Sequence, residues 1–415
     1  MSAAPPLTLA QADALLRRAD PLFYYDVSPL FDPNWTGIPV VAGALAQQLL
    51  LRFPDRTRFF YEDHLVALEA VEDALRRGSG TFLLRDFQRG EANGGPLPLI
   101  AANPAGGEPD GRPQLTIGLF PSVKPRRGLF DIECSVAHDF STLVMPLFHV
   151  AGNIHHHMQR MLIDLDSDDV TACVSHATLT DLSGYMGPRE TQLTIAYNGV
   201  SWPEWFAVQA ANEVDVENVE PFFLILGTRE PRKNISRILE LLTLFPDVMQ
   251  SHRFVFAGRM GWLAEQQAIP ESLRRNIEAG RITFPGFVSD YTKYKLLMAA
   301  EATIYPSYFE GFGLPVLESL SVGTPCIASY SSSLPEVGGD LCWYHDPFSV
   351  QDLYRAVREV QMARPKQSPE FRQRCRDRAA AFTWTAMLDR ILIGMAGALL
   401  RKFGQAAETP AETAG

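Results

Sequence analysis

Two glutamates, Glu310 and Glu318, bracket a short stretch that contains Gly311, Gly313 and Pro315. Glycine lets a ligand approach the main chain, and proline at the first helical position leaves the N-terminus of a helix open. The free N–H groups and the positive end of the helix dipole then favour a phosphate or diphosphate. We therefore expect Glu318 to accept hydrogen bonds from sugar or ribose hydroxyls and Glu310 to face the transferred group.

The elements around this stretch follow the order strand, loop, helix. The apolar run from Ala302 to Tyr305 predicts a buried strand, and a helix is expected to start near Pro315. An acidic residue in a first helical turn can simply complement the helix dipole. For either glutamate taken alone, a structural role therefore explains the sequence as well as a functional one.

A group of cations occupies another strand, loop and helix unit. The apolar run from Phe222 to Leu226 predicts a buried strand, and Arg229, Arg232 and Lys233 follow it before an amphipathic helix. Carboxyl ends of parallel strands share one edge, so these cations are expected to face the Glu310 loop. Fixed cations there lower the barrier as a leaving diphosphate develops negative charge. A basic surface loop is the alternative.

Two further strand-to-loop junctions lie in the first half of the chain. Gly37 stands between a strand-like segment at Leu22 to Ser28 and an apolar, helix-forming segment at Val40 to Leu51. His138 ends an apolar-leaning strand, at the position where an α/β sheet places ligands. An ordinary turn explains Gly37 equally well on this feature alone, and a single histidine is more often structural than catalytic.

Two other groups of residues do not predict chemistry. His155, His156 and His157 are consecutive and would point to different sides of a helix, whereas chelation from a helix uses i, i+4 spacing. We expect a solvated helix face and no bound metal. The short basic patch from Lys124 to Arg127 predicts a solvated loop. The alternative is a binding site for an anionic lipid or acceptor.

Length, net charge and composition limit the classes of protein to which the chain can belong. At 415 residues the chain is too long for one ordinary core, so two domains are expected. The formal net charge of -11 argues against a broad nucleic-acid-binding surface, because phosphate contacts need clustered Lys and Arg. The composition, 46% hydrophobic and 20% charged, is that of a soluble globular protein. We expect no nucleic-acid partner.

The cysteines and the N-terminus indicate a compartment. Five scattered cysteines without CxxC spacing are typical of a reducing environment and predict no structural zinc. The first twenty residues lack a basic start followed by an apolar core, and no run approaches the ~18 to 20 apolar residues that span a bilayer. We expect a cytoplasmic protein, with a peripheral contact to the inner membrane surface left open.

The run E-G-F-G-L-P-V-L-E, from Glu310 to Glu318, resembles the retaining GT-B glycosyltransferases of family 4, the glycosyl transferases group 1. The likeness extends through Gly323-Thr324-Pro325 and Ser333 to Val337, while G-T-R-E-P-R-K-N, from Gly227, resembles mannosyltransferase-like members. Many relatives have Gly-Arg where this chain has Gly227-Thr228, so either Arg229 or Arg232 can supply the guanidinium.

The first half carries scattered landmarks of the same family. His138 stands in a segment similar to T-V-H-D-L, whose histidine lies near the donor sugar, and further segments match V-S and Y-N-G-V landmarks. The family's first loop implies that Gly37 lies over the donor phosphates. The segment after R-I-T-F-P-G-F-V implies base contacts for Phe287 and Val288, although core packing explains them equally well. Arg259 is expected near the diphosphate or at the surface.

The resemblance and the repeated strand, loop and helix order imply an α/β protein of the GT-B type, with two doubly wound, Rossmann-like parallel-sheet domains facing across a cleft. The expected boundaries are 1–218 for the acceptor-side domain, 219–384 for the nucleotide-sugar-binding domain, 385–403 for a helix that crosses back, and 404–415 for a disordered tail. Gly90 to Pro113 predicts a long surface excursion.

The implied function is retaining transfer of a sugar from a nucleotide diphosphate sugar to an acceptor hydroxyl, without metal or other cofactor. The implied catalytic residues are His138, Arg232, Lys233 and Glu310. The implied nucleotide-sugar-binding residues are Gly37, Arg232, Lys233, Val288, Glu310, Gly311, Phe312, Gly313, Leu314 and Glu318. In this scheme the leaving phosphate takes the acceptor proton, with Glu310 as a covalent nucleophile being the weaker alternative.

The sequence leaves the donor, the acceptor and one alternative function open. GDP-mannose is the first candidate donor, and the acceptor is expected to be a carbohydrate or a lipid-linked sugar of polysaccharide or glycolipid assembly. A GT-B phosphorylase is disfavoured because no pyridoxal lysine signature stands out. A catalytically silent GT-B protein that binds nucleotide sugar as a scaffold is the alternative from another functional class.

Overall fold

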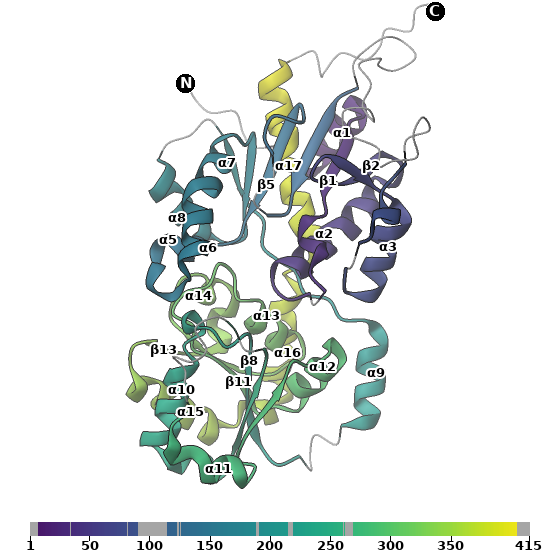
Figure 1. Ribbon diagram of the computed structural model, residues 1–415. Helices are drawn as coiled ribbons and strands as arrows, with labels where there is room; N and C mark the ends of the chain where they lie inside the picture. The colour runs from purple at the N-terminus through teal and green to yellow at the C-terminus, as the bar shows by residue number, and fades with distance from the viewer. Residues whose placement is uncertain are drawn as a thin grey trace, which may run out of the picture.

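Two β-sheets organise the chain, one in each half, as Figure 1 shows for the computed structural model. The structure describes residues 7–33, 35–80, 82–89, 114–122, 124, 126–187, 191–214, 219–259, 261 and 269–404. The predicted surface excursion at Gly90 to Pro113 lies outside the described residues, as does nearly all of the predicted tail at 404–415.

The first sheet has the strand order β3-β2-β1-β4-β5-β6-β7. Its strands are β1 Leu22–Asp26, β2 Thr57–Tyr61, β3 His64–Val66, β4 Thr116–Phe120, β5 Ile132–Ala137, β6 Val170–Cys173 and β7 Gln192–Ile195. All pairs are parallel except β2 with β3 at one edge, which the sequence analysis did not anticipate. The order reverses between β1 and β4, and such a switch point is where open α/β sheets bind ligands.

Helices surround this first sheet. They are α1 Leu9–Ala19, α2 Ile38–Arg52, α3 Leu68–Arg77, α5 Ser141–Val144, α6 Ala151–His156, α7 Leu162–Asp166 and α8 His176–Met186. A π-helical turn, His157–Met161, joins α6 to α7. The β5 strand is buried along its whole length, as expected for a parallel strand covered on both faces.

The second sheet is wholly parallel, with the order β10-β9-β8-β11-β12-β13. Its strands are β8 Phe222–Leu226, β9 Arg253–Ala257, β10 Ile282–Gly286, β11 Ala302–Tyr305, β12 Cys326–Ser329 and β13 Cys342–His345. Its helices are α10 Ile235–Leu244, α11 Arg274–Glu278, α12 Asp290–Ala299, α13 Leu314–Ser321, α14 Leu334–Gly338, α15 Val350–Ala363 and α16 Pro369–Ala380. Here the order reverses between β8 and β11, which carry the cation loop and the Glu310 loop.

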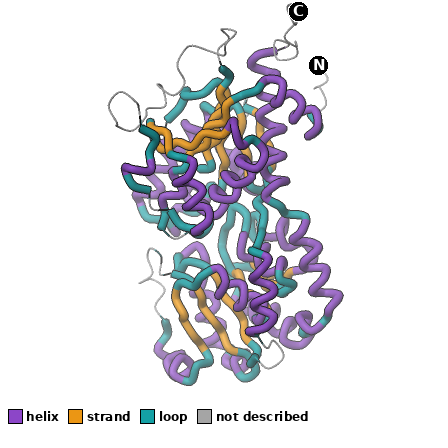
Figure 2. Tube along the Cα trace, turned by 90° about the vertical axis from the view of Figure 1, so that its right-hand side faces the viewer, coloured by secondary structure: helices purple, strands orange, loops and turns teal. Residues whose placement is uncertain are grey.

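Two helices connect the halves. Helix α9, Glu204–Glu213, lies on the connection from the first sheet to the second, and α17, Trp384–Phe403, returns to the first half. Helix α17 packs against α1, α2 and strands β5, β6 and β7. Figure 2 shows the two groups of strands one above the other, with loops concentrated between them. The carboxyl ends of the strands thus bring loops of both halves together.

The α17 region corrects one expectation about membranes. By length and mean hydropathy alone, the described helical stretch Pro369–Phe403 would be long enough and apolar enough to cross a bilayer. The sequence alone predicts that this apolar run is too short to span a bilayer. More than half of its most apolar window, 56%, is buried inside the protein, where α17 packs on the first sheet. A core helix passes the same test, because burial and a bilayer both favour apolar residues.

Candidate active site

A cavity of about 520 Å³ lies between the two halves, where the loops of both sheets meet. Every residue of the implied catalytic and nucleotide-sugar-binding sets lines this cavity, whereas Arg229, also expected at the Glu310 loop, does not. The first half contributes Gly37 and His138, and the second contributes Arg232, Lys233, Val288, Glu310, Gly311, Phe312, Gly313, Leu314 and Glu318. Residues far apart in the chain are therefore brought to one place, as ligand sites at sheet switch points require.

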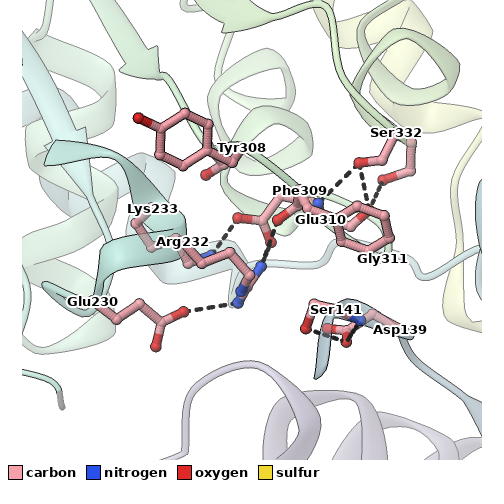
Figure 3. Close-up of polar contacts among 12 residues, drawn as sticks. Asp139, Ser141, Glu230, Arg232, Lys233, Tyr308, Phe309, Glu310, Gly311 and Ser332 are labelled. Atoms are coloured by element: carbon pink, nitrogen blue, oxygen red, sulfur yellow. Dashed lines mark hydrogen bonds and ion pairs between the residues drawn. The ribbon is translucent and has the colours of Figure 1, made fainter. Parts of the chain in front are cut away.

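Arg232, Lys233 and Glu310 form the charged centre of the cavity, as Figure 3 shows. One carboxylate oxygen of Glu310 lies 2.9 Å from Nη1 of Arg232, and the other lies 2.7 Å from Nζ of Lys233. Arg232 also pairs with Glu230 at 2.8 Å and donates a hydrogen bond of 2.7 Å to the carbonyl oxygen of Phe309. Both oxygens of Glu310 are thus engaged by cations.

The local backbone explains why both cations point the same way. Residues Pro231–Lys233 form a 3₁₀ turn after β8, and Asn234 ends it in the left-handed conformation, with φ of 56°. The side-chain amide of Asn234 donates hydrogen bonds to the carbonyl oxygens of Pro306, at 3.0 Å, and Pro347, at 2.9 Å. These bonds hold the cation turn against the loop after β11 and the loop after β13.

The charges of this centre stabilise one another. Burial by itself raises the pKa of Glu310, but the positive charges of Arg232 and Lys233 outweigh it and lower that pKa to about 2. Burial also raises the pKa of Asp139, and the charge of Arg232 reverses this, so the pKa falls below its ordinary value. Glu310 and Asp139 are therefore ionised at neutral pH, and Arg232 lies between them.

The Glu310 loop leads into the open end of a helix. Gly313 caps α13 with φ of 99°, a conformation that favours glycine, and Pro315 stands in the first turn. Leu314 and Pro315 line the cavity. The start of α13 is one residue earlier than expected, and its first turn faces the space beside Arg232 and Lys233. An anion in that space would meet free backbone N–H groups and two cations.

Glu318 lies on α13 and faces the same cavity. Its carboxylate lies 2.7 Å from Nζ of Lys293, which comes from α12 and also pairs with Asp290 at 3.2 Å. Burial lowers the pKa of Lys293, but the charges of Glu318 and Asp290 outweigh it, so the pKa is raised. Lys293 is a charged cavity residue that the sequence analysis did not single out.

His138 lies on the opposite wall of the cavity, immediately after β5. Its Nε2 lies 2.7 Å from the carbonyl oxygen of Pro121, which can only accept a hydrogen bond, so Nε2 carries the proton. Burial lowers the pKa of His138 below its ordinary value, although the bond to Pro121 opposes this shift. The ring is therefore neutral at pH 7, and Nδ1 is its acceptor atom.

Two arginine positions were left open by the sequence: which of Arg229 and Arg232 enters the cavity, and where Arg259 lies. Arg232 lines the cavity, whereas Arg229 does not and stacks over the ring of Phe284, with its guanidinium carbon 5.0 Å from the ring centroid. Arg259 lines the cavity too and donates a hydrogen bond of 3.2 Å to Thr36 of the first half. Gly37 follows Thr36 with φ of 63°, and no atom lies within 4 Å of the place where its Cβ would be.

One further cavity residue escaped the sequence analysis as a site residue. Asn198 is buried and lines the cavity, and its Oδ1 has no hydrogen-bond partner among the residues that the structure describes. A buried amide oxygen without a partner is uncommon in proteins, so this atom is a candidate ligand contact. Its position directly after Thr194 to Tyr197, at the Asn-Gly end of a strand-like segment, was the available signal, because ligand residues gather at the carboxyl ends of strands.

Two predictions about polar groups outside the cavity were wrong in part. Lys124 was expected in a solvated loop, but it is fully buried and pairs with Asp168 at 2.6 Å and Glu133 at 3.0 Å. Burial without partners would be costly for this cation, and the two acids compensate it. His157 was expected on a solvated helix face, but its Nδ1 lies 2.9 Å from Oγ1 of Thr142.

Within the described ranges, no group of three His, Cys, Asp or Glu residues is placed to hold a metal ion.

Comparisons with known proteins identify relatives of part of the chain. Residues 210–382 match the family model described as glycosyl transferases group 1. The chain is 30% identical over 224 residues to the O-antigen chain mannosyltransferase B of Escherichia coli, covering 52% of this chain and 58% of that protein. It is 31% identical over 163 residues to the GDP-mannose-dependent alpha-(1-6)-phosphatidylinositol dimannoside mannosyltransferase of Mycobacterium tuberculosis, covering 38% of this chain and 39% of that one.

The likeness to solved structures extends over the whole fold. The sucrose-phosphate synthase of Thermosynechococcus elongatus superimposes with a TM-score of 0.60 at 16% identity, covering 93% of this chain and all of that one. The curated relatives, in contrast, are matched over little more than half of their length at most. The fold is therefore that of the GT-B glycosyltransferases, and residues 210–382 match a glycosyl transferases group 1 domain.

Proposed function

We propose that this protein is a retaining glycosyltransferase that transfers mannose from GDP-mannose to an acceptor hydroxyl. One observation carries the proposal: two cations and a helix N-terminus converge on one side of a cavity, opposite His138. That arrangement suits the two phosphates and the sugar of an activated donor. The glycosyl transferases group 1 match over residues 210–382 supports it.

The proposed positions of the donor follow from the charges. The diphosphate lies between the first turn of α13 and the side chains of Arg232 and Lys233, where both the helix dipole and the cations favour negative charge. Glu318 accepts hydrogen bonds from the ribose hydroxyls beside it. Glu310 and His138 orient the sugar between the two halves, with Nδ1 of His138 as an acceptor for a sugar hydroxyl.

Retention follows in this scheme without a covalent intermediate. The bond between the anomeric carbon and the phosphate oxygen breaks, and its electron pair stays on the phosphate. The acceptor oxygen bonds to the anomeric carbon from the same face, and its proton passes to the leaving phosphate oxygen. Both oxygens of Glu310 are held by cations, at 2.9 and 2.7 Å, which favours an electrostatic role for Glu310 over that of a nucleophile.

The donor and acceptor are argued from the relatives. Two of them are named as mannosyltransferases, and one of these is named as GDP-mannose-dependent. One name refers to an O-antigen chain and the other to a phosphatidylinositol dimannoside, which supports a carbohydrate or lipid-linked acceptor. We also propose that this acceptor is met at the cytoplasmic membrane face. We further propose transfer without a metal, because Arg232 and Lys233 supply the positive charge that a divalent cation would otherwise provide.

A donor screen tests the function. The chain would be incubated with GDP-, UDP-, dTDP- and ADP-sugars, in EDTA or with added divalent metal. Binding of each donor and release of the nucleoside diphosphate would be measured in the presence and absence of candidate acceptors. We expect release only from GDP-mannose, and acceleration by an acceptor. The Lys233→Ala variant controls for contaminating hydrolases. Tight GDP-mannose binding without release in any arm would indicate the silent scaffold instead, and release only with added divalent metal would overturn the metal-independent mechanism.

A further inference from the structure

A carboxylate of the second half caps a helix of the first half. Glu336, on α14, accepts hydrogen bonds from the backbone N–H groups of His176, at 2.8 Å, and Ala177, at 2.7 Å. These are the first two residues of α8, and the hydroxyl of Tyr197 adds a third hydrogen bond to the same carboxylate at 3.2 Å. Helix α14 lies at the boundary between the two halves (Figure 1).

This contact completes the capping of α8. Oγ of Ser175, the N-cap residue, accepts a hydrogen bond from the N–H of Thr178, which leaves the N–H groups of His176 and Ala177 without an intrahelical partner. Glu336 satisfies both and places a negative charge at the positive end of the helix dipole. Separation of the halves would break the three hydrogen bonds to Glu336 at once.

The segment that carries Glu336 also holds the catalytic loop. Oγ of Ser332 donates to the carbonyl oxygen of Glu310 at 2.8 Å and accepts from its N–H at 2.9 Å, as Figure 3 shows. Oγ of Ser333 donates to the same carbonyl oxygen at 2.8 Å. Glu310 is thus tied to a short segment whose next helix caps α8.

The first turn of α8 touches the same loop from the other side. Oγ1 of Thr178 lies 3.2 Å from the carbonyl oxygen of Gly311 and 3.2 Å from that of His138. The contact between α8 and α14 therefore lies beside the place where the Glu310 loop meets His138. Two anchors on one helix turn fix the loop relative to the first half.

We propose that Glu336 is a positioning residue that holds the two halves closed and thereby sets Glu310 and Gly311 against His138. Its effect on turnover rests on the proposed transferase function, whereas its effect on closure does not. A closed arrangement excludes water from the donor and brings the two walls of the cavity into register. Loss of the Glu336 contact shifts the population toward open forms, in which the loop and His138 are separated.

Two variants probe the contact from its two sides. Glu336→Ala removes the acceptor. His176→Pro removes one donor without weakening α8, because proline is favoured at the first helical position and the preceding Ser175 is extended, with φ of -159° and ψ of 166°. Asp340→Asn is the matched control, since its carboxylate is exposed, lies shortly after α14 and pairs only with Arg374 in the described residues.

The decisive measurement is small-angle X-ray scattering without ligand, with circular dichroism as the check on folding. We expect a larger radius of gyration for Glu336→Ala, a smaller increase for His176→Pro and none for Asp340→Asn. With the donor found in the screen, kcat is expected to fall by about tenfold for Glu336→Ala, about the loss of one charged hydrogen bond, while KM for the donor changes little.

The outcomes separate the two proposals. Unchanged scattering for folded Glu336→Ala and His176→Pro overturns the positioning role, whatever the enzyme does. Changed scattering together with wild-type kcat overturns the link to the catalytic loop. Changed scattering in a protein that transfers no sugar from any donor supports the closing contact and refutes the transferase. If Glu336→Ala does not fold, His176→Pro decides, because its helix is preserved.

Discussion

The main chain of Gly311 lies so close to His138 that a Cβ atom at position 311 would fall 1.8 Å from the carbonyl oxygen of His138. Gly311 belongs to the loop after β11 in the second half, and His138 follows β5 in the first. Only glycine allows this approach, so the side-chain size at one position determines how closely the Glu310 loop can meet the opposite wall.

Replacing this glycine is expected to separate the walls of the cavity. Gly311→Ala forces the loop or His138 to move, because the nearest atoms are the backbone carbonyl of His138 and Cβ of Asp139, which cannot rotate away. Turnover should fall at least about tenfold, since displacements of about 1 Å at a reacting centre cost that much or more. Gly184→Ala is the control, since no atom lies within 4 Å of its added Cβ in α8. Equal turnover in both variants and the wild type would contradict the close contact.

Lys233→Ala tests the charge at the leaving group. Its ammonium lies 2.7 Å from Glu310, and its loss leaves Arg232 as the only one of this pair to face the diphosphate. Turnover at saturating donor should drop at least about tenfold, roughly 1.4 kcal/mol of transition-state stabilisation. Lys295→Ala removes an equal charge from a partly exposed pair with Glu213 and should keep full activity. A folded Lys233→Ala variant with wild-type rates would remove this residue from the mechanism.

Glu318→Ala tests the ribose contact. The substitution removes the carboxylate that faces the cavity 2.7 Å from Lys293, and turnover should decrease at least about tenfold. Wild-type protein is expected to bind GDP more tightly than the analogue that lacks both ribose hydroxyls, measured by calorimetry. The variant should bind the two nucleotides equally. A preference that survives in Glu318→Ala would place the ribose elsewhere, and Glu359→Ala on α15 provides the control for charge alone.

A buried lysine outside the cavity should make stability depend on pH. Lys366 is buried, and this burial lowers its pKa from 10.5 to about 7, although Glu301 opposes the shift. The unfolded chain therefore binds more protons than the folded one between about pH 7 and 10.5, so this residue makes the folded state more stable as the pH rises through that window. Below about pH 7 its destabilising effect is complete.

Lys366→Met is the corresponding variant. It should raise the free energy of unfolding at pH 7 by about 1 to 3 kcal/mol, because an unfavourable buried charge is replaced by a side chain of similar length. The gain should shrink as the pH rises from about 7 and should approach zero only above pH 10.5, where the wild-type lysine is neutral in both states. Urea unfolding at several pH values measures both. A gain that is independent of pH would mean that packing, not the charge, explains the effect.

Many residues of the site could be predicted because they directly follow strand-forming segments of the sequence. Gly37, His138, Lys233 and Glu310 each follow an apolar strand-forming run, and all four line one cavity. In a parallel sheet the carboxyl ends of the strands share an edge, so a local strand assignment places the following loop as well. The predicted fold of two α/β sheets followed from the same repeated units and is confirmed.

Other features depended on contacts between distant segments. No local sequence pattern predicts the burial of Lys124 against Asp168 or the packing of α17 on the first sheet. Nor does a local pattern predict that Arg232, and not Arg229, lines the cavity. The same is true of the antiparallel β3 and of Glu336, whose partners are backbone N–H groups that carry no residue identity.

The sequence by itself determined which segments become strands, loops and helices, and therefore which side chains stand at the ends of strands. Hydrophobic periodicity and the positions of glycine and proline determine local structure over a few residues, so the sequence alone shows them. Only the tertiary structure decided that Glu310 bridges Arg232 and Lys233 and that Gly311 abuts His138. Those relationships arise when two sheets face each other, because charge pairing and close packing depend on distance in space and not on separation along the chain.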